Sequence, residues 1–200
     1  MRVVITAAAA AALLAALAVP AGARVEAKPG PWCGGSLWKL MTLSDAGRGS
    51  VNWTAAGTTI PDLAKQNAPI KIPVARSGSF EKQQWQLSAV IERYRLASNG
   101  EIVMELFDIG SGMYMNAYMP NPKCLSSATR GRASILGARN AFSSACPTAT
   151  NAWQLLGATA KLTGVGFWNP VRSTPGALKN GAELRPVTSF SLINGCGKTG

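Results

Sequence analysis

Three consecutive segments in the middle of the chain alternate between apolar and polar residues, which is the period of a half-buried β-strand. They cover residues 85–96, 101–108 and 113–119. Asn99-Gly100 separates the first two segments and Gly110-Ser111-Gly112 the last two, and both sequences favour tight turns because Asn and Gly tolerate positive φ. The pattern predicts a three-stranded antiparallel meander. An isolated meander is only marginally stable, so it must pack against further elements.

A helix and two more strands are predicted after the meander. Ser127 or Thr129 is a suitable N-cap for a helix that ends near Ala145, and Ala158–Phe167 and Leu184–Ile193 are the fourth and fifth strands. This order of elements is that of the OB fold, a five-stranded Greek-key barrel. We therefore predict a mainly β protein with one or two helices, in which a five-stranded OB-like barrel has its helix between strands 3 and 4. Other small barrels would accept the same strands.

The remaining segments have weaker patterns. Thr150–Leu156, which carries Trp153, is a second short helical candidate, and Pro61–Gln66 is another because proline is tolerated in the first turn of a helix. Residues 48–79 are otherwise rich in Gly, Pro, Ser, Thr and Ala, which indicates a connecting arm laid over the barrel. Trp38 stands in an apolar cluster without a clean period and is interpreted as core or cover.

The N-terminus has the three parts of a secretory signal peptide. Arg2 gives a basic start, residues 3–19 form an apolar, alanine-rich run, and Ala21-Gly22-Ala23 has the small residues of a cleavage site. The alternative is an uncleaved anchoring helix, since the run approaches the length of a membrane span. The helix-breaking Pro20 and the Ala-Gly-Ala end favour cleavage after Ala23.

Export sets the expected domain organisation and location. The chain divides into a signal peptide at 1–23, an N-terminal arm at 24–79 and an OB-like barrel domain at 80–200. After cleavage, no later stretch of the sequence is long and apolar enough to span a bilayer. The expected location is secreted, periplasmic or in the cell envelope.

The chain has four cysteines: Cys33, Cys124, Cys146 and Cys196. In an oxidising compartment, an even number of cysteines favours two disulfides. The cysteine spacings match no zinc motif and the chain has no histidine, so no metal or cofactor is expected. Three pairings are possible. Cys124 with Cys146 is favoured because it would clip the two ends of the predicted helical segment, and Cys33 with Cys196 would then join the ends of the mature chain.

The absence of histidine also excludes Ser-His-Asp and Cys-His catalysis. The nine acidic residues are scattered, and only Glu101, Glu105 and Asp108 gather on or beside one strand. No phosphate-binding glycine motif is present. The leading interpretation is therefore a non-catalytic binding or structural module. The alternative is a nuclease-like or other hydrolase whose acids and arginines converge on the barrel face.

The charge balance points to the class of ligand. The sequence contains 20 Lys and Arg against 9 Asp and Glu, a net charge of +11, and basic surfaces attract polyanions and anionic cell surfaces. OB folds commonly bind ligands beside the loop between strands 4 and 5, where this chain has Trp168, Arg172, Lys179 and Arg185. We expect a polyanion or a cell-envelope polysaccharide. Nucleic acid is less favoured. OB folds usually also bind it through the loop between their first two strands, and here that loop is only the short Asn99-Gly100 turn.

Two segments carry a family resemblance. Gly164–Asn169 (GVGFWN) and Asn180–Val187 (NGAELRPV) resemble a group of uncharacterised exported bacterial proteins, actinobacterial-like, that have a GVGFWD segment and a closing ELHPV. The PWCGGSLW opening and the strand that begins at Trp85 also look like members of that group. The resemblance covers most of the mature chain, and it implies relatedness without implying an activity.

The departures from the group pattern fall on polar residues. Asn169 stands where the group has aspartate, Arg172 and Arg185 stand near or at its two histidines, and Asn180 and Glu183 match. If the relatives use this set for metal binding or acid–base chemistry, this chain has lost it. If the set only pins the long loop, the arginines can pin it through Glu183 or backbone carbonyls. We favour the pinning role, and the resemblance adds Asn180 and Glu183 to the candidate site residues.

Overall fold

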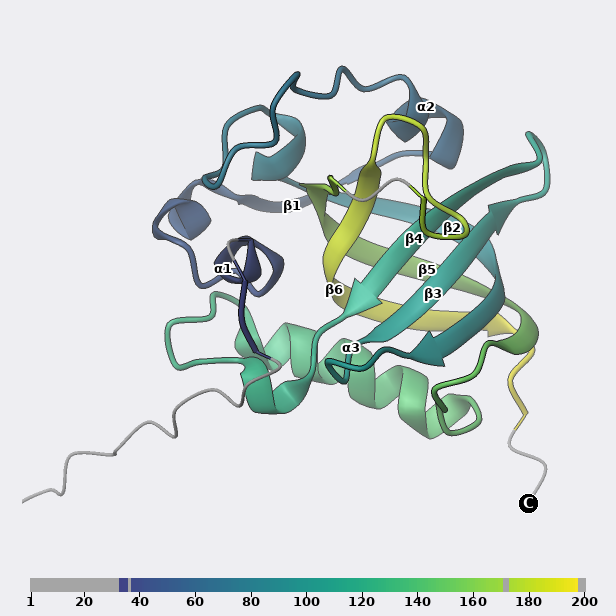
Figure 1. The fold of residues 1–200 in the computed structure, drawn as a ribbon. Helices are drawn as coiled ribbons and strands as arrows, with labels where there is room; N and C mark the ends of the chain where they lie inside the picture. The colour runs from purple at the N-terminus through teal and green to yellow at the C-terminus, as the bar shows by residue number, and fades with distance from the viewer. Residues whose placement is uncertain (1–32, 36, 171–172, 198–200) are drawn as a thin grey trace, which may run out of the picture.

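Six strands form one hydrogen-bonded sheet that curls back on itself (Figure 1). The computed structural model describes residues 33–35, 37–170 and 173–197, and the predicted signal peptide lies outside them. Among these residues, no helix combines the length and the apolar character that crossing a bilayer requires. The strands are β1 (Asn52–Gly57), β2 (Gln83–Leu96), β3 (Ile102–Asp108), β4 (Met113–Met119), β5 (Gln154–Trp168) and β6 (Ala182–Asn194).

The helices are few and mostly short: α1 (Trp38–Met41), α2 (Ile60–Ala64) and α3 (Arg132–Ala145), with the 3-10 turns η1 (Ala46–Ser50), η2 (Phe80–Lys82) and η3 (Pro122–Cys124). α2 confirms the helix predicted at Pro61, and the Thr59 hydroxyl caps it by accepting a hydrogen bond from the Asp62 N–H at 3.2 Å. α3 begins after Gly131, which has φ of 66°. The predicted caps at Ser127 and Thr129 are therefore wrong by a few residues.

Five of the strands pair in a ring. β2 pairs antiparallel with β3 and β5, β3 with β4, and β5 with β6. β4 and β6 close the ring in parallel through one register pair, Ala117 with Leu184, so the closure is uneven. The mainly β architecture is as predicted. All five predicted strands are present, at positions that agree within a few residues.

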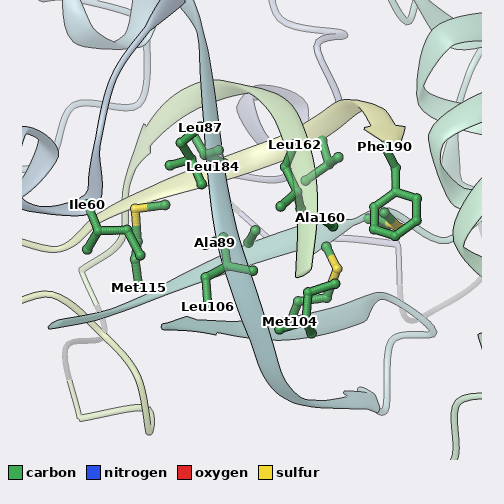
Figure 2. Close-up of a cluster of buried hydrophobic side chains, with 14 of the residues drawn as sticks. Ile60, Leu87, Ala89, Met104, Leu106, Met115, Ala160, Leu162, Leu184 and Phe190 are labelled. Carbon is green, nitrogen blue, oxygen red and sulfur yellow. The ribbon is translucent and has the colours of Figure 1, made fainter. Parts of the chain in front are cut away.

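The inward faces of the ring form the main core. Leu87, Ala89 and Ile91 alternate along β2 and are buried, as the sequence pattern predicts. Burial of the two larger side chains, Leu87 and Ile91, stabilises the fold by about 1.5–3 kcal/mol each relative to an exposed position. Figure 2 shows the same cluster drawing on most of the ring and on α2, with Ile60, Met104, Leu106, Met115, Ala160, Leu162, Leu184 and Phe190 pointing toward one another.

α3 covers one end of the ring (Figure 1). The Phe142 ring packs edge-on against Tyr94 and Phe190, with centroids 5.2 and 5.5 Å away. On the opposite side, α2 contributes Ile60 and Leu63 to the same core. Trp38 of α1 is 8% exposed and packs with Cys33 and Cys124, which confirms its interpretation as core or cover.

The predicted arm contains a strand that its sequence does not reveal. β1 runs parallel to the start of β2, with Asn52 opposite Gln83 and Ala56 opposite Trp85. Most of its side chains are exposed, so its sequence, NWTAAG, lacks the apolar–polar alternation that marks a half-buried strand.

The predicted helix at Thr150–Leu156 is wrong, because β5 already begins at Gln154. Gln154 and Leu155 pair with Tyr94 and Arg93 on the far half of β2. Pairing with β2 gives the backbone N–H and C=O groups of this segment hydrogen-bond partners, whereas a single helical turn would leave most of them without one.

The predicted disulfide pairing is also wrong. The disulfides join Cys33 to Cys124 and Cys146 to Cys196, with Cα–Cα distances of 5.4 and 4.6 Å. Cys124 precedes α3 and Cys146 follows it. The 14 residues of α3 extend about 21 Å, whereas a disulfide needs Cα atoms within about 7 Å. Instead, one bridge ties the α1 segment to η3 and the other ties α3 to the end of β6.

Peptide mapping tests this connectivity. Digestion of the purified, non-reduced protein should release one linked pair with Cys33 and Cys124 and one with Cys146 and Cys196, because these are the cysteines that meet. Reduction before digestion is the control and should separate both pairs in the mass spectrum. A Cys124–Cys146 peptide would contradict the packing of α1 against η3.

Candidate functional site

A buried arginine, Arg185, lies between two carboxylates, and one of these belongs to another predicted site residue, Glu183. Arg185 of β6 is 6% exposed. Its Nε donates to Glu101 Oε1 at 3.2 Å, its Nη2 donates to Glu101 Oε2, and its Nη1 donates to Glu183 Oε1 at 3.4 Å. Glu101 comes from the turn before β3, so this cluster joins two distant parts of the chain.

Aromatic rings and an amide complete the cluster. The Arg185 guanidinium lies 4.3 Å from the Tyr118 ring centroid and 5.7 Å from that of Phe167, close enough for cation–π attraction. Asn169 Nδ2 donates to the second Glu183 oxygen at 2.9 Å. Asn169, Glu183 and Arg185, which the resemblance singled out, therefore meet in one buried network. Their contacts suit the predicted pinning role.

The network has one cation, Arg185, for the two carboxylates of Glu101 and Glu183, and this imbalance affects the pKa of Glu183. Burial raises the pKa of Glu183 to about 7, and this effect outweighs the attraction of Arg185 and the Asn169 hydrogen bond. Arg185 is shared with Glu101, whose own negative charge also raises the pKa of Glu183.

The other candidate residues lie apart from this network. Asn180 Nδ2 donates to the carbonyls of Leu63 and Ala64 at 2.9 and 3.1 Å, which caps the end of α2. Trp168 is 2% exposed and packs on Phe80. Lys179 is exposed at the rim of a cavity of about 440 Å³. Arg172 lies outside the described residues. A ligand role for these residues stays a prediction.

A separate groove of about 440 Å³ opens between β1 and α3. Its floor comes from β2, β5 and β6, and its walls come from β1 and α3. None of the described residues that line it is charged. The lining is Trp53, Ala55, Gln84, Ser134, Gly137, Ala138, Thr163, Thr188, Ser189 and Phe190.

Gln84 gives the groove an unsatisfied polar atom. Its side chain is 4% exposed, and its Nε2 has no hydrogen-bond partner. Thr188 Oγ1 lies 3.3 Å from both Gln84 Oε1 and the Thr163 carbonyl, but its single proton can serve only one of them. If the amide is turned over, Nε2 donates to Thr188 and the oxygen is left without a donor. In either orientation, one buried amide atom has no hydrogen-bond partner in the protein, which costs about 1–3 kcal/mol.

Trp53 forms a fixed aromatic wall. It is 36% exposed, and the Arg130 guanidinium lies 4.9 Å from its ring centroid. Arg130 is itself held by three backbone carbonyls, those of Arg48, Gly49 and Val51 at 2.7 to 2.9 Å. A Cβ at Gly131 would collide with the indole, so this glycine allows the close approach as well as the left-handed turn. The ring is therefore held in place before any ligand arrives.

The groove has the chemistry of a site for an uncharged, hydroxyl-rich ligand. Ligand sites combine aromatic and apolar walls with a few placed polar groups, and here those groups are hydroxyls and one amide. Among the described residues, no cluster of three or more His, Cys, Asp or Glu is arranged to hold a metal ion. Trp53 and Gln84 are not among the sequence candidates. The available signal is a lone tryptophan in a segment otherwise poor in large apolar residues.

Comparison of the chain with protein-family models, characterised proteins and solved structures finds no match. The function of the chain must therefore be inferred from the geometry of the groove and of the buried network.

A pH titration of stability tests the Glu183 environment. A folded pKa of about 7, above the ordinary 4.5, means that the folded state binds more protons than the unfolded state between these values. This contribution is complete below about pH 4.5 and is lost as pH rises through 7. It corresponds to on the order of 3 kcal/mol. Glu183→Gln should remove this decline from urea-unfolding free energies measured between pH 4.5 and 8.

Asp62→Asn provides the matched control, since it also removes one carboxylate but at an exposed position outside the Glu183 network, and the decline due to Glu183 should persist in it. Parallel pH profiles for Glu183→Gln and wild type would contradict the raised pKa.

Proposed function

We propose that this chain is a secreted or periplasmic, non-catalytic binding module that holds a neutral polysaccharide in the groove between β1 and α3. The observation that carries the proposal is the groove lining. It combines the immobilised Trp53 ring, the incompletely bonded Gln84 amide and several hydroxyls. A flat aromatic surface and neutral donors and acceptors are what a sugar ring, apolar on its faces and hydroxylated at its edge, requires.

We further propose that the strand ring is an OB-type barrel. In support, the ring order is β2-β3-β4-β6-β5, and α3 falls between its third and fourth strands in sequence. A five-stranded Greek-key barrel with oligosaccharide- or oligonucleotide-binding members has this plan. β1 is an addition to it, paired outside the ring on β2.

The face that OB folds commonly use is filled by the chain itself. That face belongs to the second and third barrel strands, here β3 and β4. The loop before β6 crosses it (Figure 1): Asn116 Nδ2 donates to the Pro175 carbonyl at 3.0 Å. A Cβ at Gly176 would come within 2.8 Å of Asn116 Oδ1. This occupancy favours the groove near β1 as the ligand site.

A neutral polysaccharide is favoured over a polyanion because many arginines are already engaged. Arg76, for example, is 7% exposed and binds Asp45 at 3.2 Å. Protein oxygens accept hydrogen bonds from Arg76, Arg93, Arg130, Arg139 and Arg185. Positive charge used in this way is not free to bind a polymer of phosphates or sulfates.

The hydrolase alternative has weaker support. Glu101 and Glu183 are 1% and 3% exposed, and both are bound to Arg185. A glycosidase needs two carboxyl groups that flank a reachable bond. These two carboxylates are sealed in the fold.

Loss of the aromatic wall should weaken binding. The secreted protein is titrated with α-1,4- and β-1,4-linked glucan hexamers by calorimetry. Trp53→Ala should lower the affinity about tenfold or more, since one aromatic contact is removed from the ligand.

Trp153→Ala is the matched control, because Trp153 lies under Arg93 and Arg95 and does not line the groove. Circular dichroism confirms that each variant is folded. Wild-type protein that binds no neutral glycan, or Trp53→Ala with wild-type affinity, would rule out the proposal.

A cleavage assay separates the two candidate functions. Incubation with single-stranded DNA, RNA or glucan, with Ca²⁺ or Mg²⁺ present, should leave each polymer intact because the paired acids are buried. Product size is monitored by gel electrophoresis or chromatography. Steady cleavage that disappears in Glu101→Gln or Glu183→Gln would establish the hydrolase.

A further inference from the structure

The groove continues into a ladder of polar side chains on the outer face of β2, β5 and β6. Gln86 of β2 pairs with Thr163 of β5, which pairs with Ser189 of β6. In the next row, Ser88 pairs with Lys161, which pairs with Ser191. Directly paired residues share one face of an antiparallel sheet, so each row crosses three strands.

This face is turned away from the core and is accessible. The neighbouring residues Leu87 and Ala89 point into the core (Figure 2), so Gln86 and Ser88 point outward. Ser88, Lys161 and Ser191 are exposed. β1 does not extend over them, because its last register pair is Gly57 with Gln86.

The ladder connects two hollows. Thr163 and Ser189 of the first row belong to the groove itself. Ser88 of the second row lines a smaller cavity of about 240 Å³, together with Val90 and Thr159, which form a third paired position. Successive rows on one face are two residues apart along the strand, or about 7 Å. The first and third positions are therefore about 14 Å apart.

We propose that this face, which we call the polar track (Gln86, Ser88, Thr159, Lys161, Thr163, Ser189 and Ser191), binds successive units of a linear polysaccharide whose first unit occupies the groove. This inference rests on the proposed function and specifies its ligand as an extended chain. Its side chains are hydroxyls, one amide and one ammonium group, all of which bond hydroxyl and ring oxygens. The smaller cavity that Ser88 lines is also lined by Asp108, whose carboxylate can accept hydrogen bonds from ligand hydroxyls.

Lys161 is the distinguishing residue of the track. It stands in the middle row, between Ser88 and Ser191, and its ammonium group offers three donors to ligand oxygens. A single cation among hydroxyls suits a neutral chain, whereas a polyanion would need several, because its binding energy comes from neutralising many charges. A short ligand in the groove would not reach this row.

The test compares glucan dimers with hexamers on the full secreted protein by calorimetry. The hexamer should bind about tenfold more tightly than the dimer. The double variant Lys161→Ala/Ser191→Ala should lower hexamer affinity to near that of the dimer and leave dimer affinity unchanged. Both positions are exposed, so the variant should fold, which the melting temperature checks. Lys65→Ala, an exposed lysine on the loop after α2, is the control and should bind as wild type does.

The possible outcomes separate the two proposals. Equal affinity for dimer and hexamer, with Trp53 still required, would overturn the track and leave the groove intact. Equal loss of dimer and hexamer binding in the double variant would also overturn it. Absence of any glucan binding would remove the proposed function and the track together. Binding of single-stranded DNA that requires Lys161 and weakens steeply with salt would assign the face to nucleic acid instead.

Discussion

The fold depends on the backbone pairing of one long strand, β2. Its 14 residues pair with β5 along nearly their whole length, while its other edge is shared between β1 at the start and β3 at the end. A register shift between Ile91 and Arg93 interrupts the pairing of β2 with both β3 and β5, and such an irregularity bends a strand locally. The same strand therefore closes the ring around the core and supplies Gln84, Gln86 and Ser88 to the groove and the track. The groove is a consequence of the ring and of the extra strand β1 beside it.

The weakest backbone link in the ring is reinforced by side chains. β4 and β6 share one register pair, Ala117 with Leu184. The residues next to that pair are Tyr118 on β4 and Arg185 on β6, whose ring and guanidinium are 4.3 Å apart. Glu101 then ties Arg185 to the turn before β3. A buried arginine with carboxylate partners is costly to disrupt, because removing one partner leaves an unpaired charge. This cluster therefore helps to hold β4 and β6 together, a role that backbone hydrogen bonds have between the other strands of the ring.

Local patterns in the sequence predict local structure, and contacts between distant segments account for what they miss. The strands at 85–96, 101–108 and 113–119 could be predicted because alternation is encoded residue by residue. The strand β1 could not, because its exposed sequence acquires order only from the edge of β2. The disulfides join cysteines that are 91 and 50 residues apart in the chain. The local sequence pattern does not show which of these distant segments lie close together in space. Glu183 and Arg185 could be selected from sequence, but their partner Glu101 lies 84 residues from Arg185, and Trp53 becomes part of a site only when α3 and Arg130 reach it.

Composition and surface chemistry lead to different ligands, and the structure explains why. A net charge of +11 taken alone points to a polyanion. Arg76, Arg130 and Arg185 nevertheless donate hydrogen bonds to carboxylates and carbonyls of the protein itself. Net charge still acts at long range and can concentrate a protein near an anionic surface, whereas selection at contact depends on the groups that line the site. Under the proposed function, the overall charge would draw the protein to an anionic cell envelope, and the uncharged groove would recognise a neutral polymer there.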